Sequence, residues 1–580
     1  MTTDAHSPPQ PPDTGTGERR RPDPPPDATV IVIGMAAVLG VVAWAAFGKD
    51  NFSSVTDHSL NWVLGNFSWL FIIAGNVFLV TCFVIAFSRF GRIRLGRDED
   101  EPEFSSLSWI AMMFAAGMGI GLMFFGVGEP LLHFADPPPF GDIEPGSPEA
   151  ARAALEYSFF HWTLHPWAIY GVAGLGLAYA TFRKGRGNQI SAVFVPLIGS
   201  RLSAGWPGRL IDLLAVFATV FGTATSLGLG ALQVSKGLNI TTDIDDTLTL
   251  RMIIIGALGA AFVISAFSGL HKGVKWLSNI NIVLAISLAL FIFVVGPTVY
   301  ILGVVPAGVG VYLEELLVLS SRTGAFGSED WLGTWTIFYW AWWMSWAPFV
   351  GTFIARISRG RTIREFLIGV LLIPSGASVL WFSILGGSAL RIDSTGGADL
   401  TGEVNNGGEE AALFALLDAL PLGTLTAFVA MILVMLYFIT SADSASLVMG
   451  SLTSRGALHP RKWLVVAWGV LMGAVAAVLL VAGGLDSLRS GTILVALPFV
   501  VVMLAMCWAL VTELRTDPGA GAPRHMPLHG LREAVRTMVG EAVEERARGP
   551  RHWRLRRTAG NVLDRQDGTG RPPENPPQDQ

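Results

Sequence analysis

The segment 335-WTIFYWAWWMSWAPFVG-351 contains no charged residue, and five of its residues are tryptophans. With its flanks it forms an apolar run over 333–356, long enough for an α-helix to cross a hydrocarbon core of about 30 Å. A belt of tryptophans at a membrane surface occupies one level, whereas this run covers about three helical turns. Several of its rings should therefore face the interior of a helical bundle, and Pro348 and Gly351 allow a bend there.

The composition of the whole chain agrees with a membrane protein. Of its 580 residues 51% are hydrophobic and only 15% are charged, and the mean hydropathy is +0.50. Soluble domains carry about 25% charged residues, so lipid must solvate part of this surface. The net charge of −5 gives no indication of nucleic acid as a partner. Cys82 and Cys507 lie in apolar runs, where we expect small buried residues rather than disulfide or metal chemistry.

About twelve apolar stretches are long enough to span a bilayer. They lie near 28–47, 62–88, 107–134, 152–181, 209–236, 252–268, 277–303, 333–356, 365–389, 412–447, 461–483 and 488–512. Backbone amides in hydrocarbon must pair within the chain, and these runs lack the alternation of barrel strands. The sequence therefore predicts an all-α membrane protein with twelve transmembrane helices.

Charge in the connecting loops predicts the orientation. Loops after even-numbered spans carry about eighteen basic residues, against about seven on the other side. Since basic short loops stay in the cytoplasm, both termini should be cytoplasmic and the protein should be a multi-pass protein of the cell membrane. Residues 1–27 have the composition of a disordered tail. Residues 513–580 form a polar C-terminal tail, in which 527–557 would be an amphipathic helix that is either solvated or bound to anionic lipid.

The stretch 117-GMGIG-121 is unusual for a lipid-facing helix. Each glycine weakens a helix by up to about 1 kcal/mol and bares the backbone, so that amides can point at a ligand. Close packing of helices through small residues is the alternative explanation.

The stretch 161-HWTLHPWAIY-170 combines histidines with aromatic residues. His161 and His165 lie one turn apart, a spacing that suits a metal, but no third ligand is evident and buried, hydrogen-bonded histidines are the alternative.

Trp162, Trp167 and Tyr170 in the same stretch could form an aromatic cage if Pro166 distorts the helix. Each ring face attracts a desolvated cation by about 2 kcal/mol or more, which suits a quaternary ammonium that has no N–H to donate. The alternative is an aromatic belt at the membrane interface.

The stretch 437-YFITSADSAS-446 supplies hydroxyl oxygens from Thr440 and Ser441. Hydroxyls together with freed backbone carbonyls make a hard-oxygen site that suits sodium. Thr219 and Thr223 lie one turn apart in the fifth span and are a second candidate pair. In both places the alternative is back-bonding of the hydroxyl to the preceding helical turn.

Over residues 28–512 the sequence resembles the betaine/choline/carnitine transporter family. The motifs that carry the resemblance are GMGIGLMFFGVGEP at 117–130, HWTLHPWAIY at 161–170, FYWAWWMSWAPFVG at 338–351, ARISRGRTIREF at 355–366 and TSADSAS at 440–446. The resemblance implies a leucine-transporter-like fold, in which two peripheral helices precede two inverted five-helix repeats, here about 107–303 and 333–512. Each repeat would open with an interrupted helix, and members often form homotrimers.

The resemblance also implies a site, by matching motif positions. The substrate cage would comprise Trp162, Trp167, Tyr170 and Trp343, with Trp342 and Trp346 beside it and backbone amides at Gly117, Gly119 and Gly121 for a carboxylate. One sodium would be held by Ala115, Met118, Tyr437, Thr440 and Ser441, and a second by Thr219, Thr223 and Phe349. Sodium would be a coupling ion, and no other cofactor is implied.

Residue 121 bears on the substrate. Family members that import choline tend to carry an acid at this position, whereas Gly121 favours a zwitterion with its own carboxylate and coupling to sodium. The function implied is sodium-driven import of a quaternary-ammonium solute of the glycine-betaine type by alternating access. Alternatives are proton-coupled or exchange transport of choline, carnitine or ectoine, and an osmosensor without transport. A membrane-embedded enzyme would use His161, His165, Glu129 or Asp443. Catalysis needs acid and base groups that converge on a pocket, whereas this sequence offers rings and hydroxyls, so we expect that the protein is not an enzyme.

Overall fold

The computed structural model describes residues 25–117, 119–242, 244–268 and 271–521, and the regular elements in these ranges are helices. The described residues contain no strand, only an isolated bridge between Arg94 and Thr362. Among them, nine helices are long and apolar enough to cross a membrane. These are α1 (Ala28–Phe47), α2 (Lys49–Phe87), α8 (Trp206–Thr242), α9 (Leu248–Ser268), α10 (His271–Val295), α11 (Thr298–Ser321), α14 (Ile363–Ser394), α17 (Gly423–Leu452) and α18 (Lys462–Arg515). A helical membrane protein is confirmed, and the count of twelve spans stays a prediction.

Two of the predicted spans are broken near their middle. The run 107–134 is divided into α3 (Ser106–Gly117) and α4 (Ile120–Ala135), with Gly119 extended between them. This break agrees with the interruption expected at the glycine motif.

The run 152–181 is likewise divided, into α5 (Pro148–Trp162) and α6 (Leu164–Ala178), because Thr163 leaves the helical conformation (φ −116°, ψ −113°). Starting a new helix at Leu164 places Pro166 in the first turn, where an N–H has no helical partner to lose.

Other boundaries need correction. The run expected over 277–303 ends at Val295, and Pro297 precedes a separate helix, α11, that the sequence analysis missed. The run 412–447 is divided into α16 (Ala412–Asp418) and α17, with the intervening Leu422 at a φ of 63°. The runs 461–483 and 488–512 both belong to α18, whose two arms meet where Gly483 and Gly484 leave the helical conformation.

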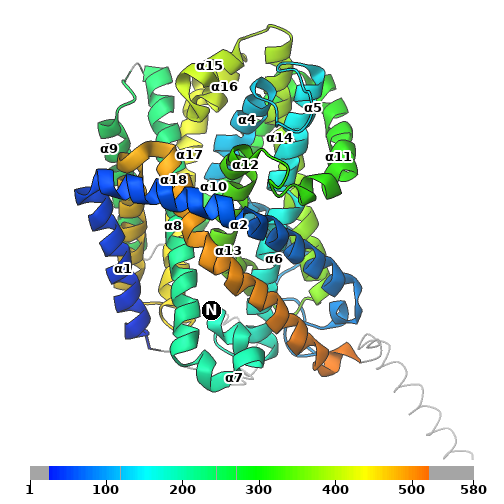
Figure 1. Cartoon of the computed structure of the whole chain (residues 1–580), viewed down its shortest axis with the longest axis vertical. Helices are drawn as coiled ribbons and strands as arrows, with labels where there is room; N and C mark the ends of the chain where they lie inside the picture. Colours follow the sequence, from blue (N-terminus) through cyan, green and yellow to red (C-terminus); the bar gives the residue numbers. More distant parts are fainter. Residues whose placement is uncertain (1–24, 118, 243, 269–270, 522–580) are drawn as a thin grey trace, which may run out of the picture. The chain divides into compact units, whose positions relative to one another are not determined.

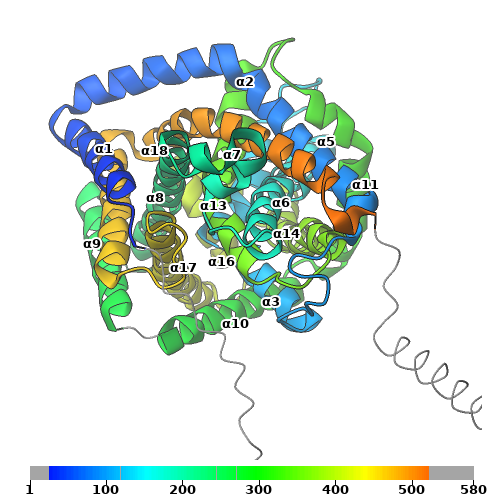
Figure 2. The same ribbon diagram turned by 90° about the horizontal axis from the view of Figure 1, so that it is seen from below.

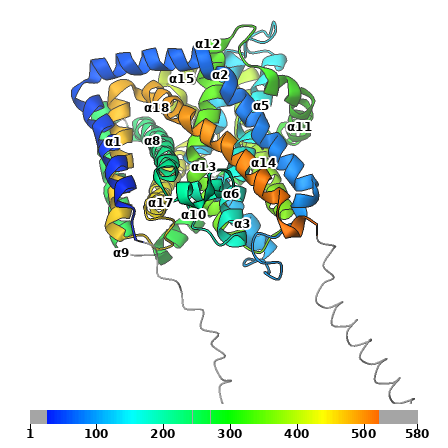
Figure 3. The same cartoon turned by 60° about the horizontal axis from the view of Figure 1, so that its bottom comes forward.

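The tryptophan-rich segment forms a π-helical turn, η4 (Gly333–Ile337), followed by α13 (Phe338–Arg356). Helical backbone continues through Pro348, so the break implied for the start of the second repeat is absent from α13. α13 lies at the centre of the helices and packs against α6, α8 and α18 (Figure 1). Seen from below, α6, α8 and α13 lie inside a surround that includes α1, α2, α9, α10 and α11 (Figure 2). α18 runs beside α2 (Figure 3).

Basic loops meet at the end of the helices where α1 begins and α18 ends (Figure 1). Arg183, after α6, donates to Asp517 at 2.9 Å and to the carbonyl of Gly96 at 3.0 Å. Burial opposes ionisation of Asp517, but hydrogen bonds from Arg183 and Tyr179 outweigh it and lower the pKa of Asp517 to about 2. The side chain of Arg94 donates to the carbonyl of Gly360 at 2.9 Å. Loops that the charge pattern assigns to the cytoplasm are therefore neighbours in the fold.

Both predicted tails lie largely outside the described residues. This holds for most of the N-terminal tail, 1–27, and for the amphipathic helix expected over 527–557. At the start of the C-terminal tail, 513–580, α18 continues to Arg515 and a short helix follows over Pro518–Ala520.

Candidate functional site

A cavity with an empty volume of about 480 Å³ lies where the start of α4 faces α6 and α13. Its lining consists of Gly119, Gly121, Leu122, Trp162, Pro166, Trp167, Tyr170, Trp342, Trp343, Trp346 and Ser378. We call this space the aromatic cavity. Its lining includes eight of the nine residues predicted for the substrate, from three separate segments of the sequence. The ninth, Gly117, ends α3, and its surroundings lie outside the described residues.

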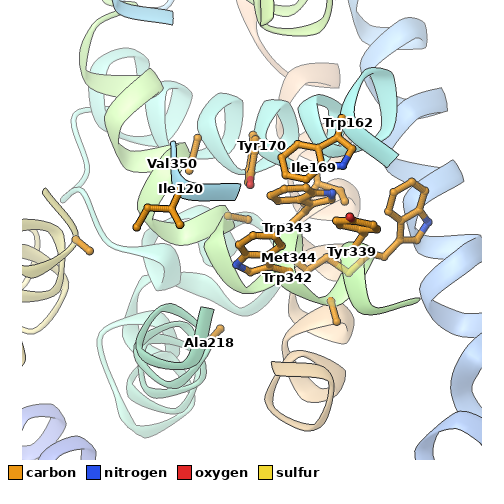
Figure 4. Packing of buried hydrophobic residues seen from close by; sticks show 14 of the residues in the cluster. Ile120, Trp162, Ile169, Tyr170, Ala218, Tyr339, Trp342, Trp343, Met344 and Val350 are labelled. Atoms are coloured by element: carbon orange, nitrogen blue, oxygen red, sulfur yellow. The ribbon is translucent and has the colours of Figure 1, made fainter. Parts of the chain in front are cut away.

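Three pairs among the four rings of the predicted cage stand at steep angles, and Figure 4 shows Trp162, Tyr170 and Trp343 close together. Trp162 and Trp343 have centroids 4.8 Å apart and planes at 74°. Trp167 and Tyr170 are 5.4 Å apart at 76°, and Tyr170 and Trp343 are 6.3 Å apart at 76°. Rings arranged in this way present faces and edges from several directions, which is the geometry that encloses a compact cation. These rings are buried among helices, so the alternative of an interfacial belt is wrong for them.

Hydrogen bonds from the indoles fix the rings of α13. Trp342 donates to the carbonyl of Gly222 at 3.2 Å, and Trp343 donates to the carbonyl of His161 at 3.0 Å. The two rings stack on each other with centroids 4.8 Å apart and planes at 13°. Since a buried indole N–H needs an acceptor, these bonds select one orientation for each ring.

Gly121 packs directly against two of the tryptophans. A Cβ atom added at this residue would lie 2.8 Å from Cη2 of Trp162 and 2.9 Å from Cη2 of Trp342. Gly121 therefore allows close packing, which was the alternative explanation for the glycines, and the groups packed against it are rings of the aromatic cavity. A larger side chain at residue 121 would enter the cavity or displace both rings.

The start of α4 also faces the aromatic cavity. Gly119 caps this helix in extended conformation and has no side chain that could accept a hydrogen bond from the amides of the first turn. Such amides have no acceptor within the helix, and a helix N-terminus favours a negative charge.

A second cavity, of about 770 Å³, adjoins the first at Gly119 and Trp346. It is lined by Gly119, Ser278, Asn281, Ile282, Trp346, Phe349, Val350, Phe353, Tyr437, Thr440, Ser441 and Ser444. We call it the polar cavity. Four of the eight residues predicted for sodium, Phe349, Tyr437, Thr440 and Ser441, are in its lining.

The sequence left open whether Thr440 faces an ion site or back-bonds within its helix, and its side chain is placed for both. Its hydroxyl donates to the carbonyl of Leu436 at 2.9 Å, which is back-bonding within α17, yet the residue also lines the polar cavity. The side-chain amide of Asn281 donates to the same hydroxyl oxygen at 3.1 Å. Sequence reasoning missed Asn281, which is a polar residue in the apolar helix α10.

The other predicted sodium residues do not join this group. Thr219 and Thr223 are buried on α8 and line neither of the two cavities. Thr219 back-bonds to the carbonyl of Ala215 at 2.8 Å, whereas the hydroxyl of Thr223 is buried with no hydrogen-bond partner. Ala115 lies near the end of α3, and its side chain, like residue Met118, is outside the described part of the chain.

The two histidines of the fourth span point to different partners. Nδ1 of His161 lies 2.6 Å from Oε1 of Glu129, and Nε2 of His165 lies 3.1 Å from Oδ1 of Asn76. A metal held jointly by His161 and His165 is therefore wrong, and buried, hydrogen-bonded histidines are confirmed.

Within the described residues, one group of His, Cys, Asp or Glu side chains is close enough to hold a metal: Glu129, His133 and His161. Two ligands about 2.1 Å from one zinc in tetrahedral geometry are roughly 3.4 Å apart. The contact of 2.6 Å between Glu129 and His161 is shorter, so these atoms are arranged as a hydrogen bond.

Comparison with known proteins gives a consistent result. A model of the betaine/carnitine/choline family of transporters matches residues 29–519. The glycine betaine transporter OpuD of Bacillus subtilis is 45% identical over 490 residues, which are 84% of this chain and 94% of OpuD. The betaine/ectoine transporter LcoP of Corynebacterium glutamicum is 42% identical over 525 residues, which are 90% of this chain and 82% of LcoP. Glycine betaine transporter 1 of Vibrio parahaemolyticus is 44% identical over 467 residues, which are 79% of this chain and 88% of that protein.

Proposed function

This chain belongs to the betaine/carnitine/choline family of transporters, and on that premise we propose that it imports glycine betaine together with sodium. Membership in the family makes the chain a membrane transporter of small quaternary-ammonium solutes rather than an enzyme. The identity of the solute, the coupling ion and the mechanism of alternating access belong to the proposal.

The observation that carries the proposal is the aromatic cavity. Trp162, Trp167, Tyr170 and Trp343 line one space, and none of the described residues that line it is charged. A trimethylammonium group cannot donate N–H hydrogen bonds, and ring faces attract it by about 2 kcal/mol or more each when water is excluded. Two relatives that carry glycine betaine in their names are 45% and 44% identical to this chain over the aligned residues.

A carboxylate on the same solute would find a partner at the start of α4. Gly119 and Gly121 line the aromatic cavity, and the first amides of α4 lack acceptors within the helix. Anions bind at such helix ends because amide groups and the helix dipole point toward them. A zwitterion with a cation and a carboxylate separated by one methylene therefore matches both halves of the site.

Sodium coupling is supported by oxygen atoms in the polar cavity and on α8. Thr440 and Ser441 line the polar cavity with Tyr437, and sodium, as a hard cation, prefers such oxygen ligands. The buried hydroxyl of Thr223, which lacks a hydrogen-bond partner, is a candidate ligand for a second ion.

Alternating access would expose the aromatic cavity to each side of the membrane in turn. The polar cavity, which adjoins it at Gly119 and Trp346, supports a route to one of the two sides. We assign the end that carries the basic loops, and with it both termini, to the cytoplasm. Assembly as a homotrimer is part of the same proposal.

Ectoine is a second candidate solute, because one relative is named as a transporter of betaine and ectoine. Its cation is delocalised over a ring, and it too carries a carboxylate, so it also matches ring faces and the start of α4.

Uptake of radiolabelled glycine betaine into proteoliposomes tests the proposal. With an inward sodium gradient the solute should accumulate, and excess unlabelled betaine should compete. Uptake that persists when lithium replaces sodium would instead indicate proton coupling or exchange. Absence of uptake under every gradient would overturn the transport function assigned here.

A further inference from the structure

A carboxylate is buried directly behind the aromatic cavity. Glu129 on α4 is completely inaccessible to solvent. Its Oε2 accepts hydrogen bonds from Nε1 of Trp162 at 2.8 Å and from the hydroxyl of Tyr339 at 2.6 Å. Its Oε1 lies 2.6 Å from Nδ1 of His161 and 3.6 Å from Nε2 of His133. Three groups that can donate thus lie within hydrogen-bond distance of its two oxygens, with His133 just beyond that distance, and such donors stabilise an ionised carboxylate away from water.

The other charges near this carboxylate compensate each other. Arg489 donates to both carboxylate oxygens of Glu409, at 2.9 and 3.0 Å. Its guanidinium also lies over the ring of Phe338, 5.3 Å from the centroid. Because this ion pair is internally neutral, it does not offset the charge of Glu129, and the neighbouring His161 and His133 offset that charge only when they are protonated.

Trp162 connects Glu129 to the aromatic cavity. One end of the indole donates its N–H to Glu129, and the other end, Cη2, packs over Gly121 in the cavity lining. A negative charge at the N–H of an indole polarises the ring and makes its face more attractive to a cation. The charge also acts directly through protein of low dielectric constant, where Coulomb energies extend over several ångströms.

We infer that Glu129 is a specificity-determining residue, whose buried negative charge gives the aromatic cavity its preference for a positively charged head group. This inference rests on the proposed function, because it concerns the ammonium end of the solute. Glu129 is hydrogen-bonded to the cavity residue Trp162, so it acts on the solute as a charge behind the ring and as a positioning residue for that ring.

A pair of ligands with the same shape isolates the effect of charge. Glycine betaine and 3,3-dimethylbutyrate differ only in the central atom of the head group, a positive nitrogen in one and a neutral carbon in the other. Their relative affinities for purified protein in sodium-containing buffer can be measured by displacement of radiolabelled betaine. The wild-type protein should prefer betaine.

The test compares Glu129→Gln with Tyr339→Phe. The glutamine side chain keeps the shape and an acceptor for Trp162 but removes the charge, so the preference for betaine over 3,3-dimethylbutyrate should fall roughly tenfold or more. Tyr339→Phe removes one hydrogen bond to Glu129 and leaves the charge, so the preference should be retained. The double substitution Glu129→Leu with Tyr339→Phe removes the charge with apolar side chains and repeats the test if Glu129→Gln does not fold.

The outcomes separate the two claims. If Glu129→Gln leaves the preference for betaine over 3,3-dimethylbutyrate unchanged, whether or not both ligands bind more weakly, the residue is only structural and the inference is overturned. If the wild-type protein binds neither ligand, the proposed function itself fails.

Discussion

Trp162 and Trp343 meet edge to face at 4.8 Å, although one ends α5 and the other lies within α13. The carbonyl of His161, which precedes Trp162, accepts the indole N–H of Trp343 at 3.0 Å. The backbone of His161, the neighbour of Trp162, thus orients the ring of Trp343. Because the break at Thr163 follows immediately, any change in the angle between α5 and α6 should alter the aromatic cavity.

Removing one ring face should weaken substrate binding. For Trp343→Leu the loss of about 2 kcal/mol corresponds to an increase of roughly thirtyfold in the betaine concentration that gives half-maximal uptake. Trp508→Leu, on the exposed side of α18 with 69% of its surface accessible, is the control and should behave as the wild type. Uptake by Trp343→Leu at wild-type affinity would contradict the cage.

Tyr170 separates the contribution of a ring from that of a hydroxyl. Its hydroxyl is buried and has no hydrogen-bond partner. Tyr170→Phe should stay within about threefold of wild-type affinity, since the ring face is unchanged, whereas Tyr170→Leu should lose tenfold or more. The measurement is betaine binding to purified protein. Equal losses in the two variants would show that the hydroxyl, and not the ring, binds the solute.

Hydroxyl oxygens of the polar cavity should set the affinity for sodium. Thr440→Val and Ser441→Ala should each raise the sodium concentration for half-maximal uptake by at least about tenfold, the scale of even outer-shell changes at metal sites. Thr426→Val, on the same helix, is the control, because that residue back-bonds to Leu422 at 3.2 Å and lines neither cavity. A sodium dependence that is unchanged in both test variants would rule out this ion site.

A charge placed at residue 121 should change the choice of solute. Gly121→Asp adds a carboxylate beside Trp162 and Trp342, so betaine should bind more weakly while choline, with a net positive charge, should gain as a competitor. Gly121→Ala introduces the same Cβ without the charge and should weaken betaine with no gain for choline. Inhibition of betaine uptake by choline is the readout. If choline also became a better inhibitor of the Gly121→Ala variant, the effect would be due to the shape of the cavity and not to the added charge.

The junction at the end of α18 should contribute to stability. Asp517 is 4% exposed and accepts from Arg183, so Asp517→Asn should lower the melting temperature in detergent. Asp98→Asn removes the half-exposed partner of the same arginine and should have a smaller effect. A larger loss in Asp98→Asn would contradict this ranking.

The same junction should be insensitive to pH in the physiological range. The folded-state pKa of Asp517 is about 2, below its usual value near 3.9, so its contribution is complete above about pH 5 and is lost progressively as the pH falls from there toward 2. The difference in melting temperature between wild type and Asp517→Asn should therefore be constant from pH 5 to pH 8.

The sequence predicted best those features of the fold and the site that depend on residues close together in the chain. The residue types in 161–170 predict an aromatic cage and those in 335–351 predict rings inside a helical bundle, whereas their union in one site was implied by the family resemblance. The break between α5 and α6 was foreseeable in kind from Pro166, but its position at Thr163 depends on how the new helix places that proline.

Features that join distant segments were not predictable in the same way. Glu129 bonds to side chains from α5 and α13, and no spacing in the sequence encodes those contacts. The signal that existed was a carboxylate in the otherwise apolar run of α4, which is costly in a membrane unless it has partners. The separate helix α11 was missed because the apolar run continues past Gly296 and Pro297, where the backbone ends one helix and starts another.

An experimental structure with glycine betaine and sodium bound would show directly whether the aromatic cavity holds the solute. We expect the trimethylammonium group within about 6 Å of the ring centroids of Trp162, Trp167, Tyr170 and Trp343, with the carboxylate toward the start of α4. Betaine bound elsewhere, with these four rings turned away from it, would show that they do not form the binding site.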